Sequence, residues 1–311
     1  GKELMQSGAV YGLLVIPRDF DKLVVQGKSP QVTSFYNAQY VLIGKLVASN
    51  MSRAFATFTA KMDAMRTLAA GGNIASLKGA VAPISTQVSP LYNLTTNYVP
   101  FLVTAAVPAL WQVFIVIAVI LAFGMEYKYR SQEQWFAAAN DSVVLAVIGK
   151  LLPYTLIAFF QGMLFLGFFY GYLGWPMHGQ WLYLLLGILF AVFAGQAIGL
   201  LIFTMTMNVT QAISMGAAYS APAFAFVGIT FPAESMPALA QIWRTLLPIT
   251  HYMQLQIGQV NYGQGFTTLL PQLGALALFV LTAFISVNKL IKYREKCRAA
   301  VDIETKGAFN E

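Results

Sequence analysis

The sequence predicts an all-α polytopic membrane protein that carries a small α/β external domain. Two long stretches, Gly79–Met125 and Leu151–Ala233, contain no Asp, Glu, Lys or Arg. A charge at the bilayer centre costs roughly 2.5–3.5 kcal/mol, and backbone polar groups there must bond within the protein. Charged residues make up 10% of the chain, against about 25% in soluble domains. These stretches are therefore expected to be helices in lipid.

Residues 1–97 are expected to form the external domain. The apolar run Val10–Ile16 predicts a short strand, and Gln31–Phe35 predicts a second one after a turn-like segment. From about residue 36 to residue 70 the apolar side chains recur with helical spacing, and two glycines then end the pattern. A polar linker is expected to connect this helix to the membrane.

The transmembrane domain is expected at residues 98–298, followed by a cytoplasmic tail at residues 299–311. Five apolar segments each have close to the roughly 20 residues that a bilayer core requires. They are Val99–Phe123, Leu151–Leu173, Trp181–Met205, Gln211–Thr230 and Thr268–Val287. Within the third, Gly195 and Gly199 form a G-x-x-x-G motif, which is typical of close helix packing. A role in a substrate path is the alternative.

Basic residues in short loops predict the orientation. Lys128, Arg130 and Lys150 flank the loop after the first span, and five of the 19 basic residues lie in Lys289–Arg298. Both regions should face the cytoplasm, which places the segment 231–265 and the N-terminal domain outside. An external N-terminal domain must be translocated, so we expect a sixth span to precede Gly1 in the full protein.

The chain lacks the motifs that would supply energy or chemistry. No phosphate-binding G-x-x-x-x-G-K-[ST] sequence occurs, and the two histidines, His178 and His251, are far apart in sequence. Within the predicted spans there are no ionisable groups of the kind that couple proton or sodium gradients to transport. We therefore expect no cofactor in this chain, and an ATP-independent carrier or an intramembrane enzyme is disfavoured.

The segment 231–265 is too polar for a plain span and too apolar for a loop. Its prolines predict a pair of short interfacial or re-entrant helices, because irregular backbone at membrane depth must line a cavity or be covered by protein. The candidate residues of an outer gate are Phe231, Pro232, Met236, Pro237 and Pro248. The alternative is that the aromatic and methionine side chains only pack a dimer core.

A short amphipathic helix is predicted in the first cytoplasmic loop, near residues 131–140. Ser131 is positioned to cap its N-terminus. Trp135 and Phe136 should anchor it in the lipid headgroups, while Glu133 and Gln134 face the cytoplasm. An ordinary interfacial loop is the alternative.

Three regions of the chain resemble the ABC-2 type permeases, the membrane subunits of type V ABC exporters. The strongest likeness is FPAESMP at Phe231–Pro237 followed by LPITHY at Leu247–Tyr252. VYGLLVIPRDF at Val10–Phe20 resembles the start of the external domain in longer bacterial members. Glu126–Tyr154 resembles the cytoplasmic coupling helix and the next span. Here the chain carries Glu126-Tyr127 and Arg130-Ser131 where the family usually has Arg-Glu and Gly-Thr.

This resemblance implies a function. A bacterial inner-membrane permease would move a small amphipathic drug or lipid-like compound outward, driven by cytosolic ATPase subunits that carry ATP and Mg. The residues implied in coupling to the ATPase are Glu126, Glu133, Gln134, Trp135 and Lys150. A second copy or a homologue would complete the pathway within membrane lipid, and no nucleic acid is involved.

The external domain resembles that of the bacterial multidrug and lipid-export branch. In this branch a periplasmic adaptor protein can dock on the domain, and here the helix at about residues 36–70 would receive it. A lid that only shields the exit is the alternative for the domain. For the whole chain, the alternative is a non-transporting receptor or scaffold with a periplasmic sensor domain.

Overall fold

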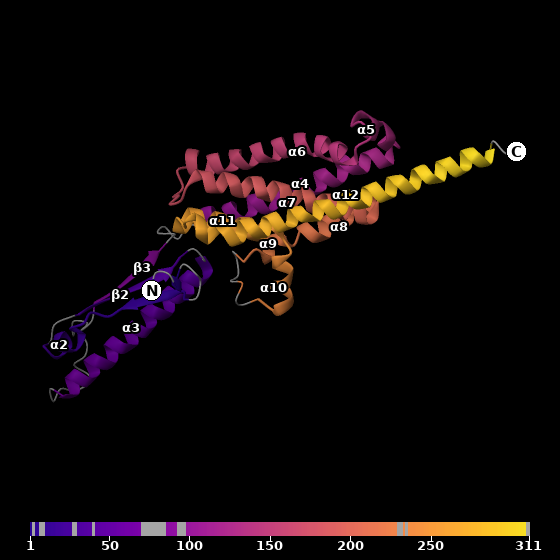
Figure 1. The fold of residues 1–311 in the computed structure, drawn as a ribbon. Helices are drawn as coiled ribbons and strands as arrows, with labels where there is room; N and C mark the ends of the chain where they lie inside the picture. Colours follow the sequence, from indigo (N-terminus) through magenta and orange to yellow (C-terminus); the bar gives the residue numbers. More distant parts are fainter. Residues whose placement is uncertain are drawn as a thin grey trace. The chain divides into compact units, whose positions relative to one another are not determined.

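The computed structural model describes residues 1, 4–5, 10–26, 30–38, 41–69, 85–91, 98–228, 233 and 236–308. The chain divides into two compact units, Gly1–Leu102 and Val103–Glu311 (Figure 1). Each unit is built differently. The first combines a small sheet with helices, whereas all described secondary-structure elements of the second are helices.

The first unit contains a three-stranded sheet in the order β1-β2-β3. Strand β1 (Gly12–Val15) pairs antiparallel with β2 (Gln31–Asn37), and β2 pairs parallel with β3 (Ser85–Leu91). The helices are α2 (Phe20–Val25) and α3 (Val41–Ala69). The two predicted strands lie where the sequence indicated, and the predicted helix starts five residues later because β2 extends to Asn37.

The segment after α3 was predicted to be a polar linker, and this was wrong for Ser85–Leu91, which form strand β3. This strand contains only two strongly apolar side chains, Val88 and Leu91, so its composition does not resemble a buried strand. It lies at an edge of the sheet, where Pro90 is tolerated because one side of the strand donates no ladder hydrogen bonds. The parallel pairing with β2 requires a long crossover, and α3 lies within it.

The second unit is formed by α4 (Tyr98–Lys128), which begins just before it, and by the helices that follow. These are α5 (Gln132–Ala138), α6 (Val143–Leu166), the π-helix η2 (Gly167–Tyr172), α7 (Trp181–Thr206), α8 (Val209–Ser220), α9 (Ala223–Phe226), α10 (Ala238–Thr245), α11 (Pro248–Tyr262) and α12 (Phe266–Ala308). Among the described residues, four helical segments have the length and apolar composition to cross a membrane. They are Val99–Lys128, Val143–Tyr172, Trp181–Thr206 and Phe266–Lys296.

The predicted fourth span, Gln211–Thr230, is not one continuous helix. Helix α8 ends at Ser220, and the short α9 begins at Ala223 after a turn. Pro222 lies in that turn, and proline cannot donate the backbone hydrogen bond that would extend α8. The prediction of five spans therefore included one segment, Gln211–Thr230, that the structure divides into separate helices. A high apolar content identified the segment but did not reveal the break.

Helix α7 is the centre of the second unit, and two of its glycines bring it close to α4. A Cβ atom on Gly199 would lie 2.8 Å from the backbone oxygen of Val116, and one on Gly195 would lie 3.1 Å from Ile115 Cγ2. Both positions are buried. The G-x-x-x-G motif therefore serves helix packing in this structure, as one of the two interpretations predicted.

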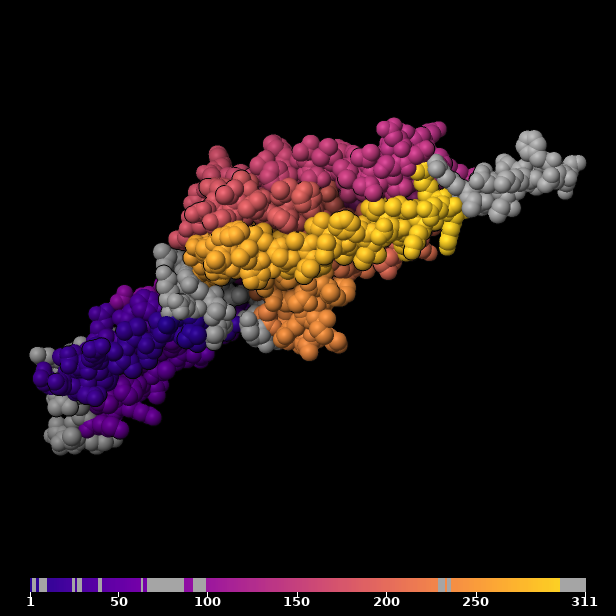
Figure 2. Space-filling model, in the orientation of Figure 1, coloured from indigo at the N-terminus to yellow at the C-terminus, as the bar shows by residue number. Residues whose placement is uncertain are grey.

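Helices α6 and α12 lie at the surface of the second unit (Figure 2). In the 18-residue apolar windows of their span segments, 28% and 17% of the residues are buried, compared with 67% for α7. The exposed apolar side chains of α12 include Phe266, Leu270, Leu278, Leu281, Phe284 and Ile285. These surfaces require a lipid or protein partner, because an apolar area of this kind is not stable in water.

Candidate coupling site around helix α5

Helix α4 ends in a motif that normally contains glycine. The amide of Ser131 donates to the carbonyl of Glu126, and the amide of Arg130 donates to that of Tyr127. This pair of bonds is the Schellman arrangement, which requires a left-handed residue at the position of Arg130. Arg130 has a φ of 55°. The resemblance described above implies a glycine at this position, and in this chain an arginine adopts the strained conformation.

Replacing Arg130 by glycine is therefore expected to raise the free energy of unfolding by about 1 kcal/mol, because the left-handed conformation costs L-residues about that much. Thermal unfolding of the detergent-solubilised protein measures the change. Arg130→Ala is the matched control, since alanine removes the same side chain but keeps the Cβ atom. Equal unfolding temperatures for the glycine and alanine variants would contradict this explanation.

Ser131 does not cap α5, contrary to the prediction. Its hydroxyl donates to the carboxylate of Glu126, and no side-chain hydrogen bond caps the N-terminus of the helix. A second left-handed turn closes the other end, where Asn140 and Asp141 have φ values of 52° and 62°. Ser142 then caps α6 by accepting a hydrogen bond from the amide of Leu145. Helix α5 is thus held between two sharp corners.

An ion pair connects the ends of α4 and α6 beside α5. The ammonium of Lys150 donates to the carboxylate of Glu126, and the two side chains are 16% and 21% exposed. Lys150 Nζ also lies 5.1 Å from the centre of the Trp135 ring, which is a cation–π distance. Three of the residues predicted to couple to an ATPase are therefore brought together.

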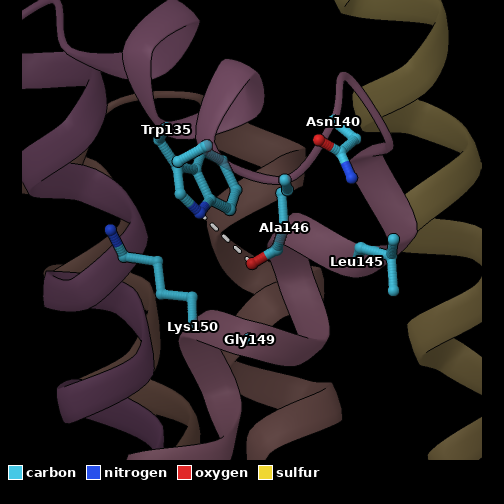
Figure 3. A pocket seen from close by; sticks show the side chains of 8 residues that line it. Trp135, Asn140, Leu145, Ala146, Gly149 and Lys150 are labelled. Atoms are coloured by element: carbon cyan, nitrogen blue, oxygen red, sulfur yellow. Dashed lines mark hydrogen bonds between the residues drawn. The ribbon is translucent and has the colours of Figure 1, made fainter.

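Trp135 joins α5 to both neighbouring helices. Its indole nitrogen donates to the carbonyl of Ala146 at 3.2 Å (Figure 3), and its ring meets Phe123 edge-on at a centroid distance of 5.5 Å. Trp135, Lys150 and Gly149 also line an open pocket of about 470 Å³. The indole is half-buried, so the side chain belongs partly to the packing of this corner.

The predicted headgroup anchor at Phe136 was wrong. Its side chain is 1% exposed and belongs to the buried apolar cluster that also contains Phe123 and Phe203. Glu133 and Gln134 of the same helix are exposed to solvent, as predicted. Helix α5 therefore has an apolar side buried in the protein and a polar side that is open to a partner.

Sequence reasoning missed Arg294 of α12. This residue is 6% exposed, and its guanidinium donates to the backbone oxygen of Asp141 at 2.6 Å and to the Asp141 carboxylate. It also lies 3.5 Å from a carboxylate oxygen of Glu133 and 4.4 Å from the centre of the Phe136 ring. Leu290 lies one helical turn earlier and is fully buried, so Arg294 is on the side of α12 that faces the core.

Three of the five residues proposed for an outer gate lie in the part of the chain that the structure describes. Phe231 and Pro232 lie outside the described residues, Met236 is half-buried, and Pro237 is exposed before α10. Pro248 is buried as the first residue of α11, where a proline is favourable because its missing N–H would be unbonded there. Pro248 therefore starts a helix, and it does not break one. Two short helices, α10 and α11, do occupy this segment.

Long apolar helices, a buried central helix and a short helix with one open polar face define a polytopic helical membrane protein. Residues 1–287 match the family described as ABC-2 family transporter protein, so the chain belongs to the ABC-2 transporter family, as the sequence motifs indicated. The inner membrane transport permeases YhhJ of Escherichia coli K12 and of Shigella flexneri are each 27% identical to it over 125 residues. Those residues are 40% of this chain and 33% of the length of each relative.

Proposed function

We propose that the chain is the membrane-spanning permease subunit of an ABC exporter. It would move a small amphipathic compound out of the cytoplasm or the inner leaflet, and a separate cytosolic ATPase would drive the movement. The observation that carries the proposal is the open polar face of α5, at the corner that connects α4 and α6. Membership of the ABC-2 family makes an ATPase the expected partner for this face.

The contacts of α5 suggest how force would be transmitted. Phe136 is buried in the core, and Trp135 contacts both α4 and α6, so α5 is attached firmly to the membrane helices. A subunit that binds Glu133 and Gln134 would therefore displace the ends of these helices together with α5. Rigid-body motion of packed elements is a common way to transmit a change at one site to another.

The apolar spans indicate the substrate class. Val99–Phe123 and Trp181–Met205 contain no Asp, Glu, Lys, Arg or His that could pair with a charged substrate. An uncharged or cationic amphipathic compound fits such walls better than an anion. Micromolar binding of a strongly anionic compound by the purified protein would contradict this part of the proposal.

Several partners complete the proposed system in the bacterial inner membrane. The exposed apolar surfaces of α6 and α12 would face lipid or a second permease copy. Unit Gly1–Leu102 would lie on the periplasmic side, where its helix α3 would dock an adaptor protein. The names of the relatives, which include the words inner membrane, are consistent with this location.

Purification with co-expressed ATPase subunits tests the proposal. We expect an ATPase to copurify with the tagged chain, and its hydrolysis rate in lipid to fall about tenfold, or about 1.4 kcal/mol, for Glu133→Gln with Trp135→Ala. Trp181→Ala is the matched control, because Trp181 is an exposed tryptophan at the first position of α7. Absence of an ATPase across several detergents would instead favour a receptor or scaffold with a periplasmic sensor domain.

A further inference from the structure

We propose that Arg294 is a positioning residue that fixes α5 and its corner on α12, so that displacement of α5 displaces α12. The proposal rests on the proposed function for its mechanistic meaning, but its structural part can be tested without an ATPase. Arg294 acts through Asp141 at the α5–α6 corner and through Phe136 and Glu133 on α5.

Burial of the guanidinium is the first support. A charged side chain taken out of water is stable only when paired and hydrogen-bonded. Arg294 is 6% exposed, yet the carboxylates that it pairs with are 55% and 59% exposed. The arginine therefore reaches from α12 into the corner and holds carboxylates that lie at the surface. A basic residue needed only for membrane orientation would remain in water, as Lys292 and Lys296 do.

The geometry at the corner is the second support. Arg294 holds both the backbone oxygen and the carboxylate of Asp141, which has a left-handed backbone between α5 and α6. Its guanidinium carbon lies over the ring of Phe136, the buried residue of α5. Lysine cannot reproduce this arrangement, because a point charge lacks the planar fork that makes several contacts at once.

The length of α12 gives these contacts a consequence. The helix has 43 residues, which corresponds to about 65 Å at 1.5 Å per residue. Arg294 lies about two thirds of the way along it, and Leu269 and Leu273 near its N-terminus are buried. The only proline of α12, Pro271, lies before residues 279–294, so a force that reaches Arg294 would be transmitted along the helix to Phe279, whose ring lies 5.8 Å from that of His251 on α11.

Spin labels at Gln134 and Lys292, both on exposed positions, test the structural part in the purified chain. Labelling is done with Cys297→Ser, which removes the single natural cysteine. We expect a narrow distance distribution that broadens in Arg294→Met and remains narrow in Lys296→Met. The control removes a charge from an exposed position of the same helix. An unchanged distribution in Arg294→Met, or equal broadening in the control, would overturn the proposal.

The mechanistic part is tested with the copurified ATPase. Arg294→Met should retain the ATPase but lower its hydrolysis rate about tenfold, which is within the usual range of coupling between two sites. In the variant with Asp141→Cys and Arg294→Cys, a flexible bis-maleimide link should restore the rate. A purely structural role would reduce ATPase retention as well, and the link would not restore it. Absence of ATPase from the wild-type preparation would refute the proposed function and this coupling role, while the spin-label result would still decide the positioning role.

Discussion

Replacing Gly199 by leucine is expected to prevent accumulation of the folded protein. Even a Cβ atom at this position would lie 2.8 Å from the backbone oxygen of Val116 and 3.0 Å from Cβ of Val119. A backbone atom cannot move aside as a flexible side chain can, so α7 and α4 would have to separate. Overpacking by a few atoms typically costs 1–3 kcal/mol, and we expect about that cost for Gly199→Ala alone. Leucine adds three more carbons and should exceed it.

The yield and thermal unfolding of the purified variants measure these effects. Gly274→Leu is the matched control, because it makes the same change in α12 at a position where a Cβ atom meets nothing within 4 Å. The control should be neutral or slightly stabilising, since glycine is unfavourable inside a helix. Equal stability of Gly199→Ala and the wild type would show that α4 and α7 do not pack as described.

Breaking the ion pair between Glu126 and Lys150 is expected to have the second largest effect on stability. Glu126→Gln would leave the ammonium of Lys150 mostly buried without a negative partner. Such a loss costs up to 1 kcal/mol for exposed pairs and 3–5 kcal/mol for fully buried ones, so we expect about 2 kcal/mol for this pair. The ends of α4 and α6 should separate first, because this pair connects them.

A double-mutant cycle separates the interaction free energy of the ion pair from the separate effects of the two substitutions. Glu126→Gln combined with Lys150→Gln removes both charges and should be more stable than the sum of the single changes predicts, since no uncompensated charge remains. Thermal unfolding at low salt measures all four proteins. Additive effects of the two substitutions would mean that the carboxylate and the ammonium do not interact.

Much of the fold could be predicted from the sequence, because charge-free stretches and apolar periodicity depend directly on membrane solvation. The segments around α4, α6, α7 and α12 were located in this way. The break at Pro222 was missed because the residues on both sides of it are equally apolar. Strand β3 was missed because its pairing with β2 is made by backbone atoms and leaves little trace in composition.

The candidate coupling site was also only partly predictable from the sequence. The location of α5 and the exposure of Glu133 and Gln134 could be predicted from local sequence. The burial of Phe136 and the role of Arg294 could not, because Phe136 joins a core cluster that includes Phe203 and Leu290, and Arg294 reaches Asp141 from more than 150 residues later in the chain. Basic residues next to a membrane span usually set the orientation of the protein, so the sequence analysis interpreted Arg294 in this way and did not anticipate its contact with Asp141.

Photo-crosslinking from α5 tests the central claim most directly. A crosslinking residue at Gln134, which is exposed on α5, should capture a cytosolic ATPase subunit in membranes of cells that express both proteins. The same residue at Leu239, which is 81% exposed on α10, should capture none. Capture from Leu239 alone, or from neither position while the two proteins copurify, would contradict the assignment of α5 as the docking element.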